Sequence, residues 1–250
     1  MTLDRGLLLY GKPISIHGLG SVGSPVLKNI YANFENAASY NLIHAILSCS
    51  LKKMRELIKA LRLEQDYADM TDLDYDEASK FKLITHSPTL REMVRSGLSL
   101  FFNEQLGWVD NNELIIVSDD GTILGVITEQ NYNAVEDLLK QTLYFGSEKT
   151  GDLKFANEAA RKLWEEQNRL EESQPQSNAE DYQLPNIISK LSCGTTGYTI
   201  FSIYELTVYQ LYDLFYSYSQ NRTSQLGENA YAHWGGEDFD PLSWLHSENK

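Results

Sequence analysis

Residues 203–218 read IYELTVYQLYDLFYSY, and this stretch decides how we expect the C-terminal part of the chain to fold. Its apolar side chains recur every three or four residues, a spacing that places them on one face of a helix. We therefore predict a helix over residues 203–218. It carries two adjacent stripes, the first formed by Tyr204, Val208, Leu211 and Phe215, and the second by Tyr209, Tyr212 and Tyr216. So broad an apolar and aromatic surface must be covered on more than one side.

The chain is rich in tyrosine: it has 15 tyrosines, and many of them fall in this stretch. Tyrosine combines a large contact area with few rotatable bonds and a polar tip, so it is favoured at protein interfaces. A buried core helix explains the same pattern equally well, and the two interpretations can hold on different faces. The interface interpretation gives as candidate partner-binding residues Tyr204, Val208, Tyr209, Leu211, Tyr212, Phe215, Tyr216 and Trp234.

Two β elements are predicted nearer the N-terminus. Residues 114–117 and 123–127 are apolar runs on either side of Asp120-Gly121, a pair that supplies the positive φ of a hairpin turn. Residues 7–10 and 14–16 form two shorter apolar runs around Gly11 and Pro13, and we interpret them as two short β segments.

Helices account for most of the remaining sequence. Ser24-Pro25 and Ser87-Pro88 are typical helix starts, with a serine cap and proline in the first turn. Apolar periodicity predicts helices at residues 25–34, 40–50, 52–63, 88–106 and 186–191, and one that Thr128 caps and that runs to Leu143. The predicted fold class is α+β and mainly α: a helical protein with a small N-terminal β element and a central β-hairpin.

Changes in amino-acid composition along the chain indicate four parts. Residues 1–150 are predicted to form an N-terminal α+β domain, followed by a charged helix over residues 151–172. Residues 173–185 contain Gln174-Pro175-Gln176-Ser177-Asn178, which is typical of a linker. Residues 186–250 then form an aromatic-rich C-terminal helical unit.

The net charge restricts the expected partners. The 21 basic and 35 acidic residues give a formal charge of -14, which repels phosphate backbones and anionic lipid surfaces. We therefore expect neither nucleic acid nor a membrane as a partner. Cys49 and Cys193 are far apart in sequence, which suits a reducing compartment and predicts a cytoplasmic protein.

Gly18, Gly20 and Gly23 have the spacing of a dinucleotide-binding loop, after a predicted strand and before a predicted helix. No strand that ends in an acid follows at the required distance, so we favour a turn and a helix cap. Asp72, Asp74 and Asp76 begin like a calcium loop but lack its glycine and its last glutamate. The sequence thus points to no catalytic, cofactor-binding or metal-binding residue, and we expect a protein that is not an enzyme.

Several short segments resemble proteins encoded among the tail genes of tailed bacteriophages. They are Ser24 to Ile30 (SPVLKNI), Asn131-Tyr132-Asn133, Ala156 to Ala160 (ANEAA), Ile187-Ile188-Ser189, Leu206 to Asp213 (LTVYQLYD) and the Trp244-Leu245 ending. The resemblance spans most of the chain, and LTVYQLYD is its most specific part. It implies a role in tail or baseplate morphogenesis, often described as that of an assembly chaperone, and it brings no catalytic residues.

We therefore expect a protein-binding factor without enzymatic activity that acts in bacteriophage tail or baseplate assembly, in the host-cell cytoplasm. Its expected partners are tail or baseplate proteins, and a homo-oligomer is compatible with the same surface. One alternative is a permanent structural component of the virion. An alternative of another class is a nucleotide-dependent enzyme that uses the loop from Gly18 to Gly23.

Overall fold

A computed structural model describes residues 2–109, 112–144, 183–194 and 197–234. The chain divides into two compact units, each treated below by itself. Unit 1 comprises Met1–Glu148 and Tyr204–Tyr209, and unit 2 comprises Lys149–Ile203 and Gln210–Lys250. The described residues are mainly helical with two small antiparallel sheets, which confirms the predicted α+β, mainly α class.

The N-terminal element is part helix and part strand. Helix α1 (Arg5–Tyr10) precedes strands β1 (Ile14–Ile16) and β2 (Gly20–Val22), which pair antiparallel. The prediction of a β segment at residues 7–10 was wrong because both ends of this stretch are capped as a helix. The Asp4 side chain accepts a hydrogen bond from Leu7 N–H, and Gly11, with φ 74°, donates its own N–H to the Leu8 carbonyl.

Six helical segments follow in unit 1. They are α2 (Leu27–Ile30), α3 (Phe34–Ser48), α4 (Leu51–Ala60), α5 (Asp72–Glu77), α6 (Lys80–His86) and α7 (Pro88–Leu98), with the 3₁₀ turn η1 (Glu64–Tyr67) between α4 and α5. The predicted start of α7 is confirmed, since Ser87 Oγ accepts from Leu90 N–H and Pro88 is the first helical residue. The helix ends at Leu98, earlier than predicted, and α2 covers only part of residues 25–34.

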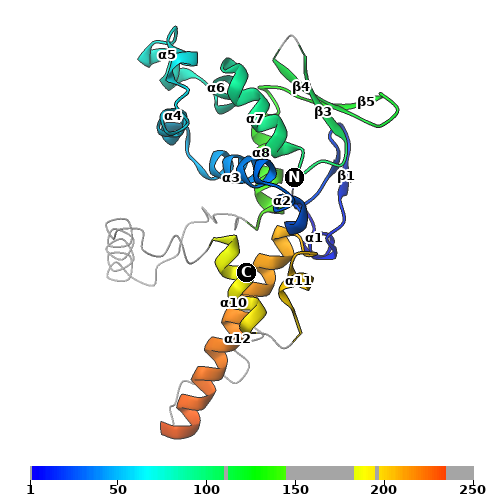
Figure 1. The fold of residues 1–250 in the computed structure, drawn as a ribbon, viewed down its shortest axis with the longest axis vertical. Helices are drawn as coiled ribbons and strands as arrows, with labels where there is room; N and C mark the ends of the chain where they lie inside the picture. The colour runs from blue at the N-terminus through cyan, green and yellow to red at the C-terminus, as the bar shows by residue number, and fades with distance from the viewer. Residues whose placement is uncertain (1, 110–111, 145–182, 195–196, 235–250) are drawn as a thin grey trace. The chain divides into compact units, whose positions relative to one another are not determined.

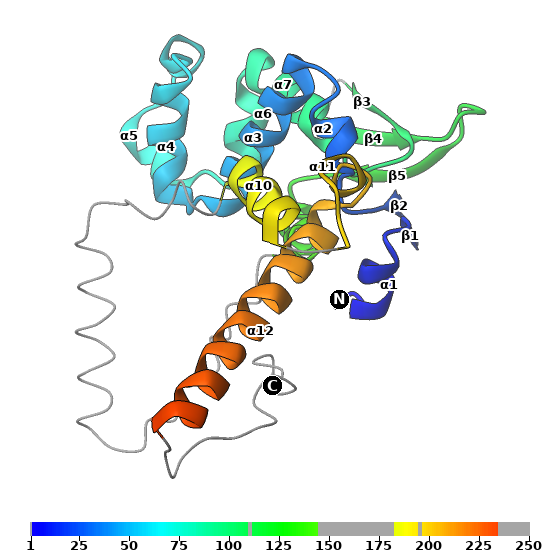
Figure 2. The same ribbon diagram turned by 60° about the horizontal axis from the view of Figure 1, so that its bottom comes forward.

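The central sheet has three antiparallel strands in the order β3 (Gln105–Val109), β4 (Glu113–Val117) and β5 (Ile123–Ile127), as Figure 2 shows. The β4–β5 hairpin was predicted and is confirmed, whereas β3 was expected to be the end of the helix before it. One face of the sheet is buried through Leu106, Leu114, Ile116 and Ile127. Helix α8 (Tyr132–Thr142) follows β5.

The core of unit 1 contains the contact between α3 and α7, and α7 also touches β3 (Figure 1). Close approach of α3 and α7 depends on Gly97. A Cβ atom there would lie 2.8 Å from both Ile43 Cβ and the Ser39 carbonyl oxygen. Neither atom is at the end of a flexible side chain, so the two helices are packed at a distance that only glycine permits.

Replacing Gly97 with alanine is therefore expected to lower the free energy of unfolding by about 1–2 kcal/mol, since overpacking outweighs the better helix propensity of alanine. Urea denaturation followed by circular dichroism measures this change. Gly107→Ala on β3 is the matched control, because its added Cβ would meet nothing closer than Ile115 Cγ1 at 3.7 Å. Equal stability of the two variants would contradict the packing argument.

Unit 2 is helical in its described part. It contains α10 (Leu184–Gly194), α11 (Ile200–Ile203) and most of α12 (Val208–Trp234), a helix of 27 residues. The helix predicted from residue 203 thus begins five residues later and extends further than expected. The predicted charged helix (151–172) and most of the predicted linker (173–185) lie outside the described residues.

Candidate partner-binding site

The aromatic stretch is anchored to the N-terminal domain by backbone hydrogen bonds. The N–H groups of Leu27 and Lys28, which begin α2, donate to the carbonyls of Leu206 and Tyr204, both at 2.9 Å. In return Val208 N–H, at the start of α12, donates to the Pro25 carbonyl at 2.8 Å. Two helix starts therefore satisfy each other's free N–H groups, and we call the pairing of residues 24–28 with residues 204–209 the reciprocal cap.

Ser24 completes the reciprocal cap with its side chain. Its Oγ accepts a hydrogen bond of 2.9 Å from Tyr209 N–H, although 185 positions separate the two residues in the sequence. Ser24 was expected to cap a helix beginning at Pro25, and this expectation was wrong. Residue 26 takes the capping position of α2 without a side-chain hydrogen bond, because Val26 has extended backbone and bridges Thr207 as in an antiparallel sheet.

The side chains around the reciprocal cap are mostly buried. Val208 is 0% exposed and Tyr209 is 7% exposed. The ring of Tyr209 lies 5.0 Å from that of Tyr144, and the ring of Tyr204 meets Tyr31 edge to face at 5.8 Å. Of the eight predicted partner-binding residues, Val208 and Tyr209 are therefore buried in unit 1, and Tyr204 is half-buried there.

Replacing Ser24 with alanine removes the hydroxyl that caps α12, so the free energy of unfolding is expected to fall by about 1 kcal/mol, the usual cost of losing an N-cap. Chemical denaturation of the full chain measures it. The control is Ser217→Ala, an exposed serine further along the same helix, which is expected to change stability by less than about 0.5 kcal/mol. If Ser24→Ala behaves like this control, the reciprocal cap does not stabilise the fold through Ser24.

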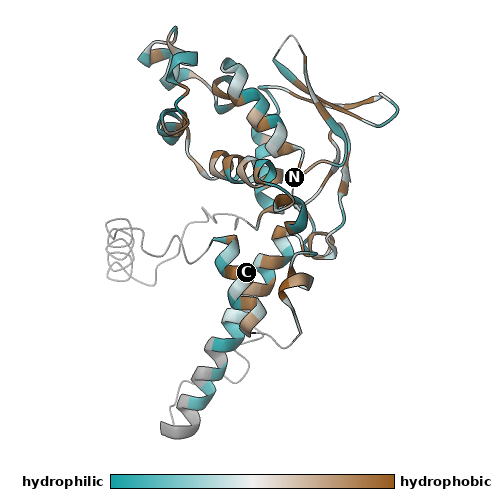
Figure 3. Ribbon diagram, in the orientation of Figure 1, coloured by the Kyte–Doolittle hydropathy of each residue, from teal (hydrophilic) through white to brown (hydrophobic). Residues whose placement is uncertain are grey.

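The other predicted residues lie in unit 2. Leu211 is fully buried, Tyr212 and Phe215 are half-buried, and Tyr216 is 43% exposed. The rings of Phe215 and Tyr216 meet edge to face at 5.9 Å. Figure 3 shows hydrophobic residues in the early turns of α12. The side chain of Trp234 lies outside the described residues.

A groove of about 460 Å³ runs between α10 and α12, and it was not predicted from the sequence. Its lining is formed by Lys190, Cys193 and Gly194 of α10 and Phe215, Tyr218, Ser219 and Arg222 of α12. Gly194 allows Tyr218 to lie against α10, because a Cβ atom at Gly194 would be only 2.5 Å from Tyr218 Oη. The helical spacing of the lining residues on each helix was the available signal, but such spacing does not show which two helices face each other.

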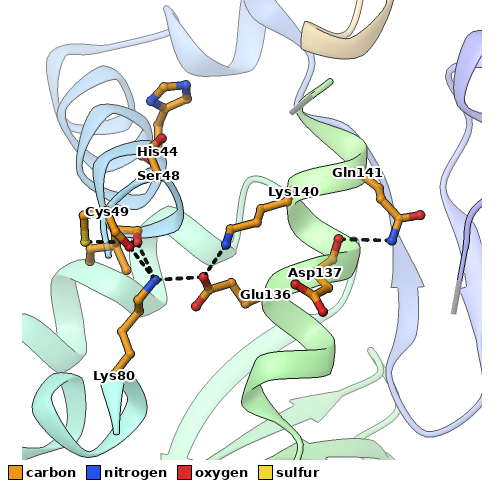
Figure 4. Close-up of polar contacts among 9 residues, drawn as sticks. His44, Ser48, Cys49, Lys80, Glu136, Asp137, Lys140 and Gln141 are labelled. Carbon is orange, nitrogen blue, oxygen red and sulfur yellow. Dashed lines mark hydrogen bonds and ion pairs between the residues drawn. The ribbon is translucent and has the colours of Figure 1, made fainter. Parts of the chain in front are cut away.

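A cluster of charged side chains, formed by Lys80, Glu136 and Lys140, lies inside unit 1 (Figure 4). The ammonium group of Lys80 donates to the carbonyls of Ile46 and Cys49, both at 3.0 Å, and to Glu136 Oε1 at 2.8 Å. Lys140 reaches the same Glu136 oxygen at 2.7 Å. The two carbonyls belong to the end of α3, so Lys80 acts as a C-terminal cap whose three N–H groups all have acceptors.

The neighbouring titratable groups have the pKa shifts of buried structural residues. Burial raises the pKa of the Cys49 thiol and lowers the pKa of His44. Burial, followed by the charge of Glu136, raises the pKa of Tyr132. These shifts keep the thiol protonated and the imidazole neutral near pH 7, so the cluster holds α3, α6 and α8 together and presents no activated nucleophile.

Lys80→Met is expected to destabilise unit 1 by about 2–4 kcal/mol, since it leaves carbonyls at the end of α3 without their donor and removes a buried ion pair. Thermal unfolding measures the effect. Lys82→Met, an exposed lysine on the same helix, is the control and is expected to have little effect. Equal unfolding temperatures for the two variants would show that the cluster is not structural.

The glycine-rich stretch does not form a dinucleotide-binding layout. Gly18 and Gly20 have φ values of 77° and 71° in and beside the turn that joins β1 to β2, and these strands are antiparallel. The backbone around Gly18 packs on β5, where a Cβ atom at Gly125 would lie 1.9 Å from the Gly18 oxygen. The first N–H groups of α2, which would have to face a phosphate, are bonded in the reciprocal cap.

The described residues contain neither a candidate metal site nor a candidate membrane span. In that part of the chain no three His, Cys, Asp or Glu side chains are grouped so that they could hold a metal ion. None of the helices described has the length and apolar character needed to cross a membrane.

Comparison with known protein families finds a match in the C-terminal part of the chain. Residues 173–249 match the family model described as the YomV second domain. YomV is a protein of a Bacillus prophage, so this part of the chain is similar to a domain associated with bacteriophages. The match covers less than a third of the chain and includes α10, α11 and α12. Neither the curated proteins nor the solved structures gave a match.

Proposed function

We propose that this protein is a binding factor without enzymatic activity in bacteriophage tail or baseplate assembly, acting in the host-cell cytoplasm as a chaperone for a tail protein. The observation that carries the proposal is the aromatic surface of α12 beyond the reciprocal cap. There Tyr212, Phe215 and Tyr216 keep part of their area exposed. This surface lies within the segment that is similar to a phage-associated domain.

The physical basis is that partly exposed aromatic rings on a long helix offer contact area at little cost in conformational entropy. Residues 212–216 span little more than one turn of α12, so the three rings form one compact patch. Covering an apolar segment of a tail protein would prevent premature association of that segment until assembly. An acidic chain with a formal charge of -14 also remains soluble while it does so.

Co-expression tests the proposal. The tagged chain is expressed with each tail and baseplate protein of a phage that encodes it, and the captured protein is quantified. The double change Tyr212→Ala and Tyr216→Ala is expected to reduce capture at least about tenfold, because exposed tyrosines are frequent hot spots. Tyr209 is unsuitable for this test because it is 7% exposed and its loss would disturb folding.

The matched control removes two exposed aromatics from unit 1. Tyr10 is 65% and Phe34 is 86% exposed. The double change Tyr10→Ala and Phe34→Ala therefore also removes exposed aromatic surface, and it is expected to leave capture unchanged. Circular dichroism verifies that both double variants are folded. Capture of no tail or baseplate protein, or equal capture by both variants, would refute the proposal.

The rival within the same class is a permanent tail or baseplate component. The same aromatic surface supports it, since a subunit interface also needs exposed apolar area. Mass spectrometry of purified particles separates the two: a chaperone is absent from the finished particle, and a structural component is present in stoichiometric amount.

A further inference from the structure

Helix α5 of unit 1 is held beside α4 without burying any of its own residues. Arg55 of α4 forms an ion pair with Asp72 and lies 4.9 Å from the ring centre of Tyr75, and the two helices lie side by side in Figures 1 and 2. The aliphatic side chain of α5, Leu73, is 66% exposed. Most helices in proteins owe their stability to an apolar face that packs against a neighbour. Helix α5 therefore exposes the kind of side chain with which a short helix normally packs.

The side of α4 that faces α5 carries positive charge. Lys52 and Lys59 lie three positions before and four positions after Arg55, so they share its side of the helix. Lys52 also lies in the first turn of α4, where the helix dipole disfavours a positive charge. Both lysines are exposed, and within the described part of the chain neither makes a hydrogen bond or an ion pair. The position of Lys52 is thus not explained by the stability of its own helix.

The exposed face of α5 carries negative charge. Asp76 and Glu77 lie three and four positions after Leu73, so the three side chains share one face of this helix. Both carboxylates are exposed in its last turn, where the dipole disfavours negative charge. Like the two lysines, neither takes part in a hydrogen bond or an ion pair with a residue that the structure describes. We call Lys52, Lys59, Leu73, Asp76 and Glu77 together the α4–α5 face.

A surface with one positive and one negative part is complementary to a copy of itself. In a dimer with a two-fold axis, the same patch of both protomers forms the interface, so the positive part of one meets the negative part of the other. We infer that the α4–α5 face is an interface between two copies of this chain, in which Lys52 and Lys59 of one copy pair with Asp76 and Glu77 of the other around the two Leu73 side chains. The inference goes beyond the proposed function and does not rest on the aromatic surface of α12.

The net charge of the chain determines the conditions under which this dimer forms. At an ionic strength of about 0.15 M the Debye length is roughly 8 Å, so the repulsion between two chains of charge -14 is largely screened, whereas ion pairs in contact are screened less. Helices of 10 and 6 residues offer a small interface. We therefore expect a transient dimer with a dissociation constant of about 10–100 µM.

Sedimentation equilibrium of the full-length chain over about 1–300 µM tests the inference. Two double variants, Lys52→Glu with Lys59→Glu and Asp76→Lys with Glu77→Lys, each place like charges across the interface. Each is expected to weaken self-association at least about tenfold. All four side chains are exposed, so both variants are expected to fold.

The decisive samples combine the two double variants. All four substitutions in one chain, or an equimolar mixture of the two double variants, again place glutamates opposite lysines, so both samples are expected to associate like the unmodified chain. The fourfold variant also keeps the net charge of -14, because two changes of -2 and two of +2 cancel. Restored association would also show that the double variants had remained folded.

A matched control is Lys12→Glu with Lys82→Glu, two exposed lysines outside α4 and α5 whose reversal changes the net charge as much as that of Lys52 and Lys59. It is expected to leave the association unchanged. A monomer at every concentration, equal weakening in the control, or no restoration in the combined samples would overturn the inference. So would a dimer that is lost in the Tyr212→Ala with Tyr216→Ala variant and kept in the charge variants, because the aromatic surface of α12 would then be the interface.

Discussion

The reciprocal cap is the constraint that holds residues 204–209 in unit 1. Any helix start has backbone N–H groups that lack partners within the helix, and leaving them buried and unpaired is costly. Here α2 and α12 begin side by side, so the carbonyls before one helix accept from the first N–H groups of the other. Ser24 Oγ adds an acceptor for Tyr209 N–H. As a result, Tyr204–Tyr209 belong to unit 1, although the residues that precede them in the sequence, 149–203, belong to unit 2.

The same pairing explains which parts of the fold could be predicted from the sequence. Ser87-Pro88 and Ser24-Pro25 are almost identical local signals for a helix start. The first was interpreted correctly because Ser87 Oγ accepts from Leu90, three residues ahead. The second was not, since a hydroxyl accepts from whichever N–H is placed beside it, and tertiary structure placed Tyr209 there. The β4–β5 hairpin was predictable because its turn chemistry is entirely local.

The residue types of the candidate site were predicted from the sequence, but the positions of their side chains in space were not. Apolar periodicity correctly identified an aromatic helix, yet periodicity cannot separate rings that pack within the chain from rings that remain exposed. Tyr204 lies in the turn before the helix, where its carbonyl accepts from Lys28 N–H, whereas Tyr216 is exposed on α12 itself. The groove was missed because it needs residues of two helices, and α10 contributes only Lys190, Cys193 and Gly194.

Two lysines show how the surroundings of an ammonium group decide what it contributes to the fold. Lys80 has acceptors for all three N–H groups, at the end of α3 and on Glu136, and its side chain is 11% exposed. Desolvating such a charge is offset only while those contacts persist, so its role is to fix three helices. Lys82 of the same helix is instead exposed, so its ammonium group stays in contact with water. An exposed cation costs little to maintain, and it contributes correspondingly little to stability. Of these two lysines of α6, the fold thus depends on the buried one.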